Sequence, residues 1–523
     1  MITDITALEK MDAQALRSLA RQLLETVGTQ SKALDERAIE IKDKELKIAQ
    51  LTHEMALHRR WRFDKRSEQF KGLQGSLFEE TIDADLAAMQ TELEDLVKPE
   101  DPKQDKPRTQ PKRNPLPAEL PRTDIFHEPA HAMCGCGCAL KRIGQDVSEK
   151  LHYTPGVFTV ERHIRGRWAC VQCESIIQQP VPAQVIDKSY ATPSLLAHLL
   201  ISKFADHLPL YRLEQIYGRA GLAIPRSTLS QWVGICGVRL QPLVDALRQA
   251  VLTQDVLHAD ETPVKLLKPG QGKTHKAYLW AYASGRFEPM QAVIYEFSEN
   301  RSGENAKTFL NGWKGRLVCD YYSGYQGLFG EGKAIIEIGC LAHARRKFHD
   351  LYEANKSEIA QQALTMIGFL YDVEHEARDM TPEDRGRLRQ QKVKPILRKM
   401  RAWLVLQRTK ATDGTALARA LDYSIKRWGA LTRYVEDGRL PIDNNHLETR
   451  IRPVATGRNN WQFMGSTRAG KRAAAIMSLV QSAKLNGLDP YAYLVDVLER
   501  LPTHPNQCIQ DLLPQNWKPQ AQS

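Results

Sequence analysis

Two short stretches decide the fold of this chain: residues 256–260, Val-Leu-His-Ala-Asp, and residues 316–320, Arg-Leu-Val-Cys-Asp. Each is an apolar run that stops at an aspartate, which is the pattern of a buried strand that ends at a turn. A single aspartate at such a position commonly forms the turn or caps a helix. If the two strands are neighbours in one sheet, however, Asp260 and Asp320 lie side by side.

The segment between these strands has the pattern of a mixed sheet. Residues 277–283 and 291–297 predict two more strands, which can form a meander with the first one. Residues 304–313 predict a helix that leads into the fourth strand. The sequence therefore predicts an α/β unit, which we place at residues 251–480.

Two divalent cations held by these aspartates need one more acidic ligand. Mg²⁺ prefers oxygen ligands, and two ions about 4 Å apart can activate an attacking oxygen and stabilise the leaving one at phosphorus. Glu448 is the candidate, because Asp443 or Asn444 can cap a helix in which Glu448 lies one turn along. We interpret Asp443 as a cap, and we expect Glu261 to point away from Asp260 because side chains alternate along a strand. The predicted catalytic and magnesium-binding residues are Asp260, Asp320 and Glu448.

Length and charge describe a large basic protein. The 523 residues suffice for three or four folding units, and the net charge of +11 suits a polyanion, since each Lys or Arg beside a phosphate releases counterions. No apolar run reaches the roughly 18 residues that cross a membrane, and no secretory signal is visible. We therefore expect a cytoplasmic protein without a membrane partner.

Residues 1–100 predict a helical region. Apolar residues recur every seven positions from Leu34 to Met55 among alternating Lys and Glu, which favours a coiled coil and a homodimer or higher oligomer. A long helix packed on its own chain is the other interpretation. Residues 59–66 are basic and aromatic, as expected of a DNA contact or of a solvated helix end. Residues 101–122 are a basic, Pro-rich linker.

Five of the nine cysteines lie in a predicted small domain at residues 123–182. Their C-x-C and C-x-x-C spacing favours zinc over disulfides. Two cysteine pairs on separate turns would form a zinc ribbon with a structural Zn²⁺, in a unit too small to be held together by apolar burial. Cys170 and Cys173 form one pair, and three cysteines compete for the other two places. The zinc ligands are therefore four of Cys134, Cys136, Cys138, Cys170 and Cys173.

Residues 183–250 predict a helical, helix-turn-helix-like region for DNA binding. A helix from Leu208 precedes a turn at residues 221–224, and Pro225 begins a second helix that can pack on the first one. Helix pairs of this form also occur in ordinary cores. The residues expected to project towards a DNA groove are Arg226, Ser230 and Gln231.

The remaining segments are assigned by charge and periodicity. A charged, strongly helical stretch at about residues 345–440 predicts an insertion in the catalytic domain, and residues 481–523 predict a helical tail. Residues 480–498, whose second half has apolar residues at helical spacing, are expected to pack against the catalytic core and not to contact DNA. Beside Glu448, the residues expected to contact DNA through its backbone or an unpaired base are Arg450, Arg452, Arg458 and Trp461.

Four segments carry a specific resemblance to a known family. They are residues 258–263 (HADETP), 320–325 (DYYSGY), 340–348 (CLAHARRKF) and 457–461 (GRNNW). Over nearly the whole chain the sequence resembles the bacterial insertion sequence 66 family transposases. The resemblance implies, in order, a leucine-zipper-like region, a zinc-finger domain, a DDE catalytic domain of RNase H-like fold and a short tail. It assigns the same catalytic residues as above.

Within this resemblance, Cys340 and His343 are similar to a C-x-x-H element of some transposases with helical insertions. A core cysteine and a buried histidine are the other interpretation.

The predicted protein is thus a multidomain α/β enzyme, a DDE transposase. We expect it to bind terminal inverted repeats and target DNA, and to cleave and join strands with two Mg²⁺ ions, for which Mn²⁺ can substitute. It would associate with the nucleoid when bound to DNA, and the resemblance implies small accessory proteins of the same element as partners. The alternatives are a catalytically inactive DNA-binding accessory protein and an RNase H-like nuclease that does not integrate DNA.

Overall fold

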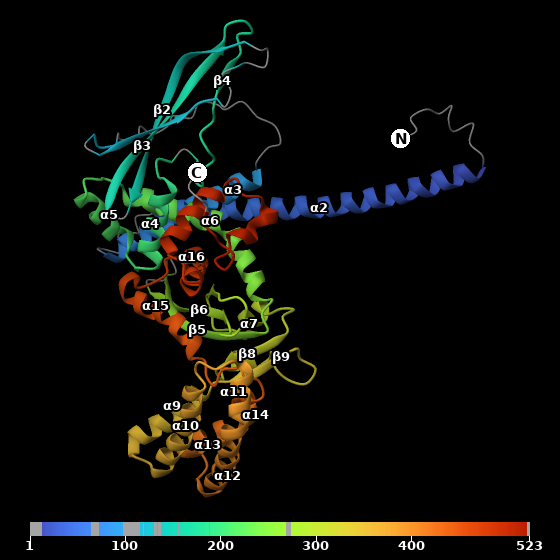
Figure 1. Cartoon of the computed structure of the whole chain (residues 1–523), viewed down its shortest axis with the longest axis vertical. Helices are drawn as coiled ribbons and strands as arrows, with labels where there is room; N and C mark the ends of the chain where they lie inside the picture. The colour runs from blue at the N-terminus through green and yellow to red at the C-terminus, as the bar shows by residue number, and fades with distance from the viewer. Residues whose placement is uncertain are drawn as a thin grey trace. The chain divides into compact units, whose positions relative to one another are not determined.

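The structure is a computed structural model, and its course is shown in Figure 1. The described residues are 13–63, 73–97, 116–118, 120–129, 133, 138–154, 156–187, 189–267 and 273–519. The chain divides into two compact units. The first unit consists of residues 1–67 and 89–109, and the second of residues 68–88 and 110–523.

The first unit is built around a long helix, α2 (Ala13–Phe63), which confirms the predicted helical N-terminal region. Several large apolar side chains of α2 are exposed, among them Leu34 (65%) and Ile41 (58%). Further along the same helix, Leu51 and Met55 are buried. The exposed apolar side chains leave a surface that a second helix could cover, so the coiled coil stays a prediction.

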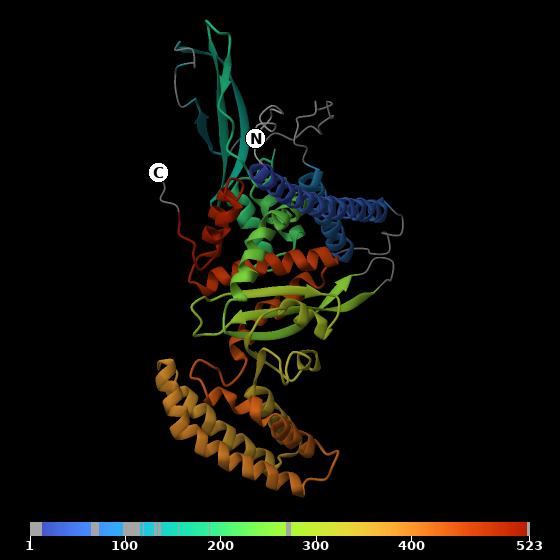
Figure 2. The same cartoon turned by 90° about the vertical axis from the view of Figure 1, so that its right-hand side faces the viewer.

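The second unit begins with part of α3 (Leu73–Val97) and a four-stranded sheet, drawn in cyan in Figure 2. The strands are β1 (Arg122–His127), β2 (Leu140–Thr154), β3 (Val157–Cys170) and β4 (Ile176–Gln178). β3 pairs with all three others, antiparallel to β2 and β4 and parallel to β1. β3 is therefore the central strand of this sheet.

Three helices follow: α4 (Pro193–Phe204), α5 (Leu210–Arg219) and α6 (Arg226–Val251). Thr192 caps α4, because its side chain accepts a hydrogen bond from the Leu195 N–H. The predicted helix, turn and second helix are confirmed, with Leu229 and Trp232 buried. At 26 residues, α6 is much longer than a recognition helix needs to be.

The main sheet has the strand order β7-β6-β5-β8-β9. Its strands are β5 (Val256–Leu267), β6 (Thr274–Ser284), β7 (Val293–Ser298), β8 (Gly315–Cys319) and β9 (Ile335–Gly339). The first three form an antiparallel meander, whereas β8 is parallel to β5 and to β9. The predicted meander and the predicted neighbouring of the two aspartate strands are both confirmed. The fifth strand was not predicted.

One face of this sheet is covered by α7 (Gly303–Phe309) and α8 (Ser323–Gln326). Tyr282 of β6 stacks on Phe309 with ring centroids 3.7 Å apart, and Trp280 meets Tyr325 edge to face at 5.8 Å. These aromatic pairs fix the two short helices on the meander.

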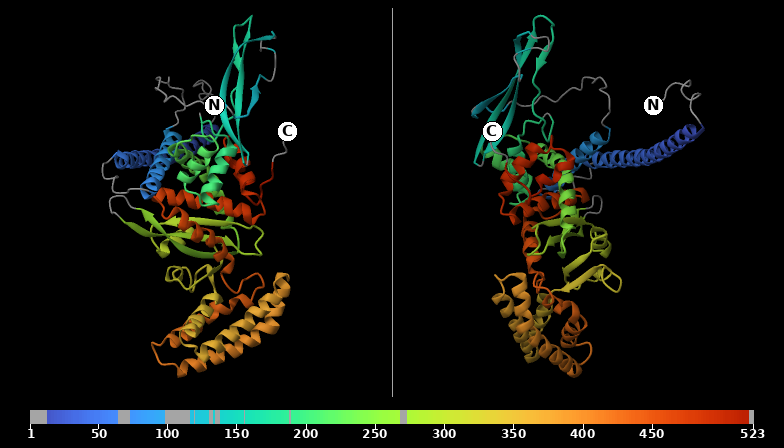
Figure 3. Two further views of the ribbon diagram at one scale, coloured as in Figure 1. Left: turned by 90° about the vertical axis from the view of Figure 1, so that its left-hand side faces the viewer. Right: turned by 45° about the vertical axis from the view of Figure 1, so that its right-hand side comes forward.

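The C-terminal helices are α15 (Asn445–Trp461), α16 (Thr467–Leu485) and α17 (Pro490–Arg500), in orange and red in Figures 2 and 3. α16 runs along β7, where Ser478 and Ser482 accept hydrogen bonds from the Tyr295 and Val293 N–H groups. These bonds cover the open edge of the sheet. The prediction that residues around 480–498 pack against the core is confirmed, since Val480, Leu494 and Leu498 are buried.

The segment between β9 and α15 is helical, as predicted for the insertion. It contains α9 (Leu341–Asn355), α10 (Glu358–Glu376), α11 (Pro382–Leu388), a π-helical turn (Arg389–Val393), α12 (Lys394–Lys410), α13 (Ala416–Lys426), α14 (Trp428–Thr432) and a 3₁₀ turn (Arg433–Val435). These helices pack in an apolar cluster to which Ile367, Met400 and Leu421 belong, and which also includes Val318 of β8 and Ile338 of β9 in the main sheet.

Across the described part of the chain, no helix is long and apolar enough to span a bilayer.

Candidate active site and DNA-binding surface

The two predicted aspartates belong to neighbouring parallel strands. Asp320 directly follows β8, as predicted, but β5 does not end at Asp260: it continues to Leu267, because residues 260–267 stay paired with β6. His258 of β5 is paired with Val318 of β8, and this register, continued by two residues, leads from Asp260 to Asp320. Neighbouring strands are about 4.8 Å apart. Each carboxylate is held by a nearby backbone N–H: Asp260 accepts from Glu261 at 2.8 Å, and Asp320 accepts from Tyr322 at 2.9 Å.

The electrostatics of Asp260 are unusual for a carboxyl group. Burial and the nearby charges of Glu261, Asp320 and Glu448 raise the pKa of Asp260 to about 8. An ionised Asp260 is therefore unfavourable unless a cation is added, and carboxylate oxygens are the donors that Mg²⁺ prefers. The donor set thus fits a divalent cation. Among the described residues, no three acidic, histidine or cysteine side chains converge closely enough to form a metal site.

Glu448 lies in the first turn of α15, as predicted. Asn444 occupies the N-cap position but makes no side-chain capping bond. The neighbouring Asp443 carboxylate instead accepts from the Asn445 N–H at 3.0 Å and from the Tyr371 hydroxyl at 2.9 Å. Asp443 is therefore a structural anchor for the start of α15, in line with its interpretation as a cap.

The buried Asn444 side chain connects the start of α15 to the catalytic strand. Its amide Nδ2 donates to the Ala259 carbonyl at 3.0 Å, which leaves Oδ1 to accept from His258 Nδ1 at 2.7 Å. Its backbone N–H donates to Cys340 Sγ at 3.2 Å. Burial lowers the pKa of His258 to about 3, so the ring is neutral. Asn444 therefore fixes the position of Glu448 relative to Asp260.

Sequence reasoning missed His258 and Asn444 as positioning residues. Both stand within two residues of a predicted site or cap residue, in HADETP and in DNNHLE. Proximity to the motifs was thus the signal that could have found them.

Replacement of Asn444 by alanine should destabilise the protein, because the buried His258 N–H loses its acceptor. An unsatisfied buried donor costs about 1–3 kcal/mol. Denaturant unfolding of Asn444→Ala should show this loss, whereas Asn445→Ala, at an exposed position in the same turn, should cost less. Equal losses for the two variants would contradict the role of Asn444.

Glu261, the rival of Asp260, has other partners. Its side chain is 1% exposed, and it accepts from Arg301 Nε at 2.7 Å and from the Tyr325 hydroxyl at 2.8 Å. Arg301 also lies over the Tyr322 ring, 3.8 Å from its centroid. The carboxylate of Glu261 is thus engaged by Arg301, two residues before α7, and by Tyr325 of α8, as expected if the strand pleat directs it away from Asp260.

A cavity of about 480 Å³ opens beside Asp320. Arg301, Tyr322, His343, Arg346, Lys347 and Tyr423 line it. Cationic and aromatic side chains next to a carboxylate suit a DNA strand, since the cations bind phosphates and the rings can stack on bases.

Cys340 and His343 have separate environments. Cys340 is buried, and burial raises the pKa of its thiol to about 12, which confirms the interpretation as a core cysteine. His343 instead lines the cavity beside Asp320, and within the described residues its Nδ1 has no hydrogen-bond partner. The C-x-x-H element stays a prediction.

The prediction that Ser230 projects towards a DNA groove is wrong. Ser230 is 0% exposed. It shares a helical face with Gly234 and Gly237, where an added Cβ would meet Ala84 of α3 and Arg472 of α16. Two other helices therefore cover this face of α6, which makes α6 a core helix. Gln231 is exposed and Arg226 half-buried, so their DNA contacts stay predictions.

The predicted basic residues of α15 differ in their surroundings. Arg450 is half-buried and donates to the His446 carbonyl at 2.8 Å, whereas Arg452 is exposed. Arg458 donates to the Pro263 carbonyl of β5 at 2.6 Å. All three arginine side chains are at least partly exposed to solvent, and their binding to DNA stays a prediction.

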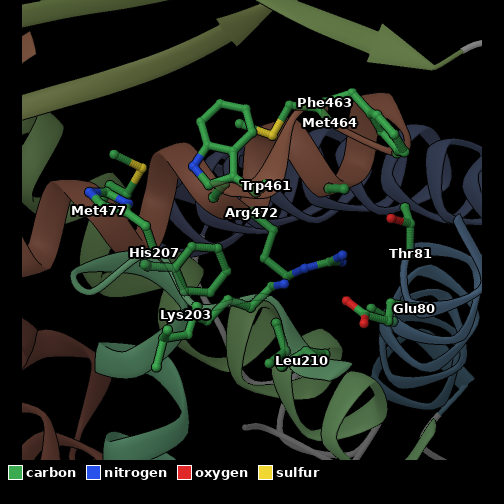
Figure 4. Close-up of a pocket in the computed structure, with 17 residues that line it drawn as sticks. Glu80, Thr81, Lys203, His207, Leu210, Trp461, Phe463, Met464, Arg472 and Met477 are labelled. Atoms are coloured by element: carbon green, nitrogen blue, oxygen red, sulfur yellow. The ribbon is translucent and has the colours of Figure 1, made fainter. Parts of the chain in front are cut away.

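Trp461 lies in the wall of a small cavity of about 80 Å³. Figure 4 shows this cavity, with Glu80 facing it from α3 and Arg472 reaching in from α16. The Trp461 ring packs partly against the core, and stacking on a base stays a prediction.

A buried ion pair lies close to this cavity. Asp85 of α3 is 0% exposed and lies 3.1 Å from Arg472. The part of α3 around Asp85 thus belongs to the core of the second unit.

Three of the predicted zinc ligands lie among the described residues. Cys170 ends β3 and Cys173 lies in the turn before β4, while Leu140, two residues after Cys138, is paired with Cys170. The Cys138 thiol donates to Gln172 in the same turn at 2.8 Å. The remaining two candidates, Cys134 and Cys136, lie outside the described residues. These three cysteines therefore lie near the open end of the β2–β3 hairpin.

Comparison with family models gives four matches along the chain. Residues 188–472 match the model described as transposase IS66 family, and residues 478–515 match the IS66 C-terminal element. Residues 132–174 match the zinc-finger binding domain of transposase IS66, and residues 50–125 match the model described as transposase C of IS166 homeodomain.

Similar proteins occur in Sinorhizobium fredii. The uncharacterized protein y4jD is 39% identical over 419 residues, which cover 77% of this chain and 81% of the relative. The uncharacterized protein y4qI is 33% identical over 536 residues, which cover 99% of this chain and 98% of the relative.

These matches define the chain as a transposase with DNA-binding regions, an enzyme that acts on DNA. It belongs to the IS66 family of transposases.

Proposed function

We propose that the protein is a DDE transposase that binds the terminal inverted repeats of its element, cleaves there and joins the ends to target DNA. The observation that carries this proposal is the placement of Asp260 and Asp320 on neighbouring parallel strands, with Glu448 on the helix that packs against β5. A meander followed by two parallel strands supports assigning an RNase H-like core to residues 251–480, with the helices near 345–440 as its insertion.

Asp260, Asp320 and Glu448 would hold two Mg²⁺ ions, for which Mn²⁺ can substitute. When bound, the ions would supply charge stabilisation for the attacking and leaving oxygens. Asn444 holds the Glu448 helix against β5. Arg346 and Lys347 of the cavity beside Asp320 would bind the phosphates of the reacting strand.

The reaction proceeds in two displacements at phosphorus. Water first attacks the phosphodiester at the element end, and the P–O3′ bond breaks to leave a free 3′-hydroxyl. That hydroxyl then attacks a target phosphodiester, loses its proton and displaces the target 3′-oxygen. No covalent intermediate with the protein is needed, so Ser and Tyr nucleophiles have no part in the scheme.

The other regions would serve DNA binding and assembly. We assign a structural Zn²⁺ to four of Cys134, Cys136, Cys138, Cys170 and Cys173 in the domain at residues 123–182. The helices within 183–250 would contact DNA through Arg226 and Gln231. Residues 1–100 would form the coiled coil of a dimer or higher oligomer, and the linker at 101–122 would separate this coiled coil from the zinc domain. Residues 481–523 would form the tail.

Analysis of DNA products tests the proposed function. The full-length protein is incubated with Mg²⁺, a duplex that carries the inverted repeats flanking its gene, and a target plasmid. A transposase yields joined strands that start at the element 3′ end. Cleaved ends without joining would indicate a nuclease, and binding without either product would indicate an accessory protein.

Binding of Mg²⁺ should release protons near neutral pH. The pKa of Asp260 is raised from 3.8 to about 8, so this carboxyl is protonated at pH 7, whereas a metal ligand must be ionised. Affinity should therefore increase as the pH rises from 6 to 8. Calorimetry in two buffers of different ionisation enthalpy measures the released protons, and Asp260→Asn should abolish the release. An affinity that is constant from pH 6 to 8 would contradict the prediction.

A further inference from the structure

A basic groove lies between the end of α15 and the β5–β6 hairpin. It encloses about 700 Å³ and is lined by Lys265, His275, Lys276, Arg458, Asn459 and Gln462. No carboxylate lines it, and within the described residues no ion pair involves its lysines or Arg458. A concave surface with several cations and two amides, and without acidic groups, is built for an anion.

The pairing of the two strands places like charges opposite each other. Lys265 of β5 and Lys276 of β6 are direct cross-strand partners, and both are exposed. Cβ atoms of such partners are about 5 Å apart, and like charges at this spacing destabilise a sheet. A bound anion would remove that repulsion, since it would lie between the two ammonium groups.

Two further features at the groove remain unexplained by packing alone. The Nε2 atom of His275 is buried and, among the described residues, has no hydrogen-bond partner. Gln462 has φ +59° and ψ −47°, and the Phe463 N–H donates to the Trp461 carbonyl at 2.6 Å across it. This is a γ-turn of the rare, strained kind. It ends α15 abruptly and keeps Gln462 at the groove.

The position of the groove relates it to the candidate active site. Lys265 follows Asp260 by five residues on the same strand, which corresponds to roughly 17 Å at about 3.3 Å per residue. In B-DNA this length spans about five base pairs at 3.4 Å each. Alternation of side chains places Lys265 on the Glu261 face of β5, opposite to Asp260. DNA that contacts both therefore passes the edge of β5 at Pro263, where Arg458 of α15 donates to the backbone, and reaches the groove with phosphates a few base pairs away.

We propose that this basic groove binds phosphates of the DNA duplex next to the reacting phosphodiester. The proposal rests on the proposed transposase function and adds a backbone contact to it. Lys265 and Lys276 bind the phosphates, and Asn459 and Gln462 donate hydrogen bonds to their oxygens. The phosphates belong either to the element end or to the target DNA, and the two sources are separated experimentally.

The test compares two double variants that remove the same charge. Lys265→Gln with Lys276→Gln changes the groove, and Lys307→Gln with Lys314→Gln changes two exposed lysines elsewhere. Binding to an element-end duplex and to an unrelated duplex is measured at several salt concentrations. Each lost phosphate contact lowers the slope of log K against log salt by about 0.9, so the groove variant should lose roughly 2 units of slope. Its affinity at about 0.1 M salt should fall at least tenfold.

Each outcome has a distinct meaning. A loss of affinity and salt slope confined to the groove variant supports the proposal. If the loss is equal on both duplexes, the groove contacts both element-end and target DNA. If the loss occurs on one duplex only, that duplex is the source of the phosphates. The thermal unfolding temperature of the groove variant should be unchanged or higher, because a like-charge pair is removed. If the salt slope of the groove variant is unchanged, or if the control variant loses as much affinity, the proposed phosphate binding by the groove is wrong. Failure of the unmodified protein to bind either duplex overturns the proposed function itself.

Discussion

Asp260→Asn, Asp320→Asn and Glu448→Gln are each expected to lower strand cleavage and joining by about 1,000-fold or more. Each change removes a negative ligand, and several kcal/mol of transition-state stabilisation depend on the cations that the three carboxylates hold. The measurement is the rate of joined product with Mg²⁺ on inverted-repeat DNA. The matched control is Glu304→Gln, which neutralises an exposed carboxylate on α7 and should leave the rate within about twofold.

The same set of variants distinguishes a catalytic role from a folding defect. Without a cation, the pKa of Asp260 lies near 8 in the folded protein and at 3.8 otherwise, so the folded state loses stability as pH rises between these values. Asp260→Asn should therefore raise the thermal unfolding temperature at pH 7.5 in chelator. A variant that is inactive, binds DNA and is more stable supports the assignment. Full activity of any of the three variants would remove that residue from the site.

The largest loss of stability is expected from Glu374→Ala in the helical insertion. Glu374 lies 2.7 Å from both Arg389 Nε and Arg389 Nη2, and 3.1 Å from Arg385. The Arg389 side chain is 0% exposed and that of Arg385 is 7% exposed. Removal of the carboxylate leaves two buried guanidinium groups without their counter-ion, which costs about 3–5 kcal/mol. Denaturant unfolding measures the loss.

Glu376→Ala provides a matched control on the same helix. Glu376 pairs with Lys392 at 2.7 Å, but both side chains are nearly half exposed. An exposed pair of this kind contributes about 0–1 kcal/mol. If the two variants lose the same stability, burial does not determine the strength of the Glu374 cluster.

The Glu374 cluster also bears on the active site. Arg389 donates to the carbonyls of Tyr434 and Asp437, and Arg385 donates to that of Gly438. This segment leads directly to Asn444 and Glu448. We therefore expect Glu374→Ala to lower DNA joining more than DNA binding, since the third carboxylate loses the support of the chain before it.

The sequence predicts those structural elements that depend on a local pattern of residues. The apolar runs before Asp260 and Asp320 predict two strands, because a buried parallel strand is almost continuously apolar. The predicted end at Asp260 is wrong, since β5 continues to Leu267. The first turn of α15 is predicted from cap residues close to Glu448. Both inferences need only a few neighbouring residues.

Contacts between distant segments could not be predicted in this way. The Asn444 side chain meets Ala259, 185 residues away, and Asp85 pairs with Arg472 at a separation of 387 residues. No periodicity of either segment contains that information. Ser230 was predicted to be exposed for the same reason. The pattern of an amphipathic helix does not show whether another helix covers its polar face.

The three candidate catalytic residues are synthesised in the order in which they occur along the chain. Asp260 and Asp320 leave the ribosome well before α15, and domains fold largely as they emerge. If Glu448 completes the site, a nascent or prematurely terminated polypeptide can assemble the sheet, yet it lacks the helix that Asn444 docks on β5. DNA cutting is then coupled to synthesis of the chain through α15, so a product interrupted before this helix would not cut DNA.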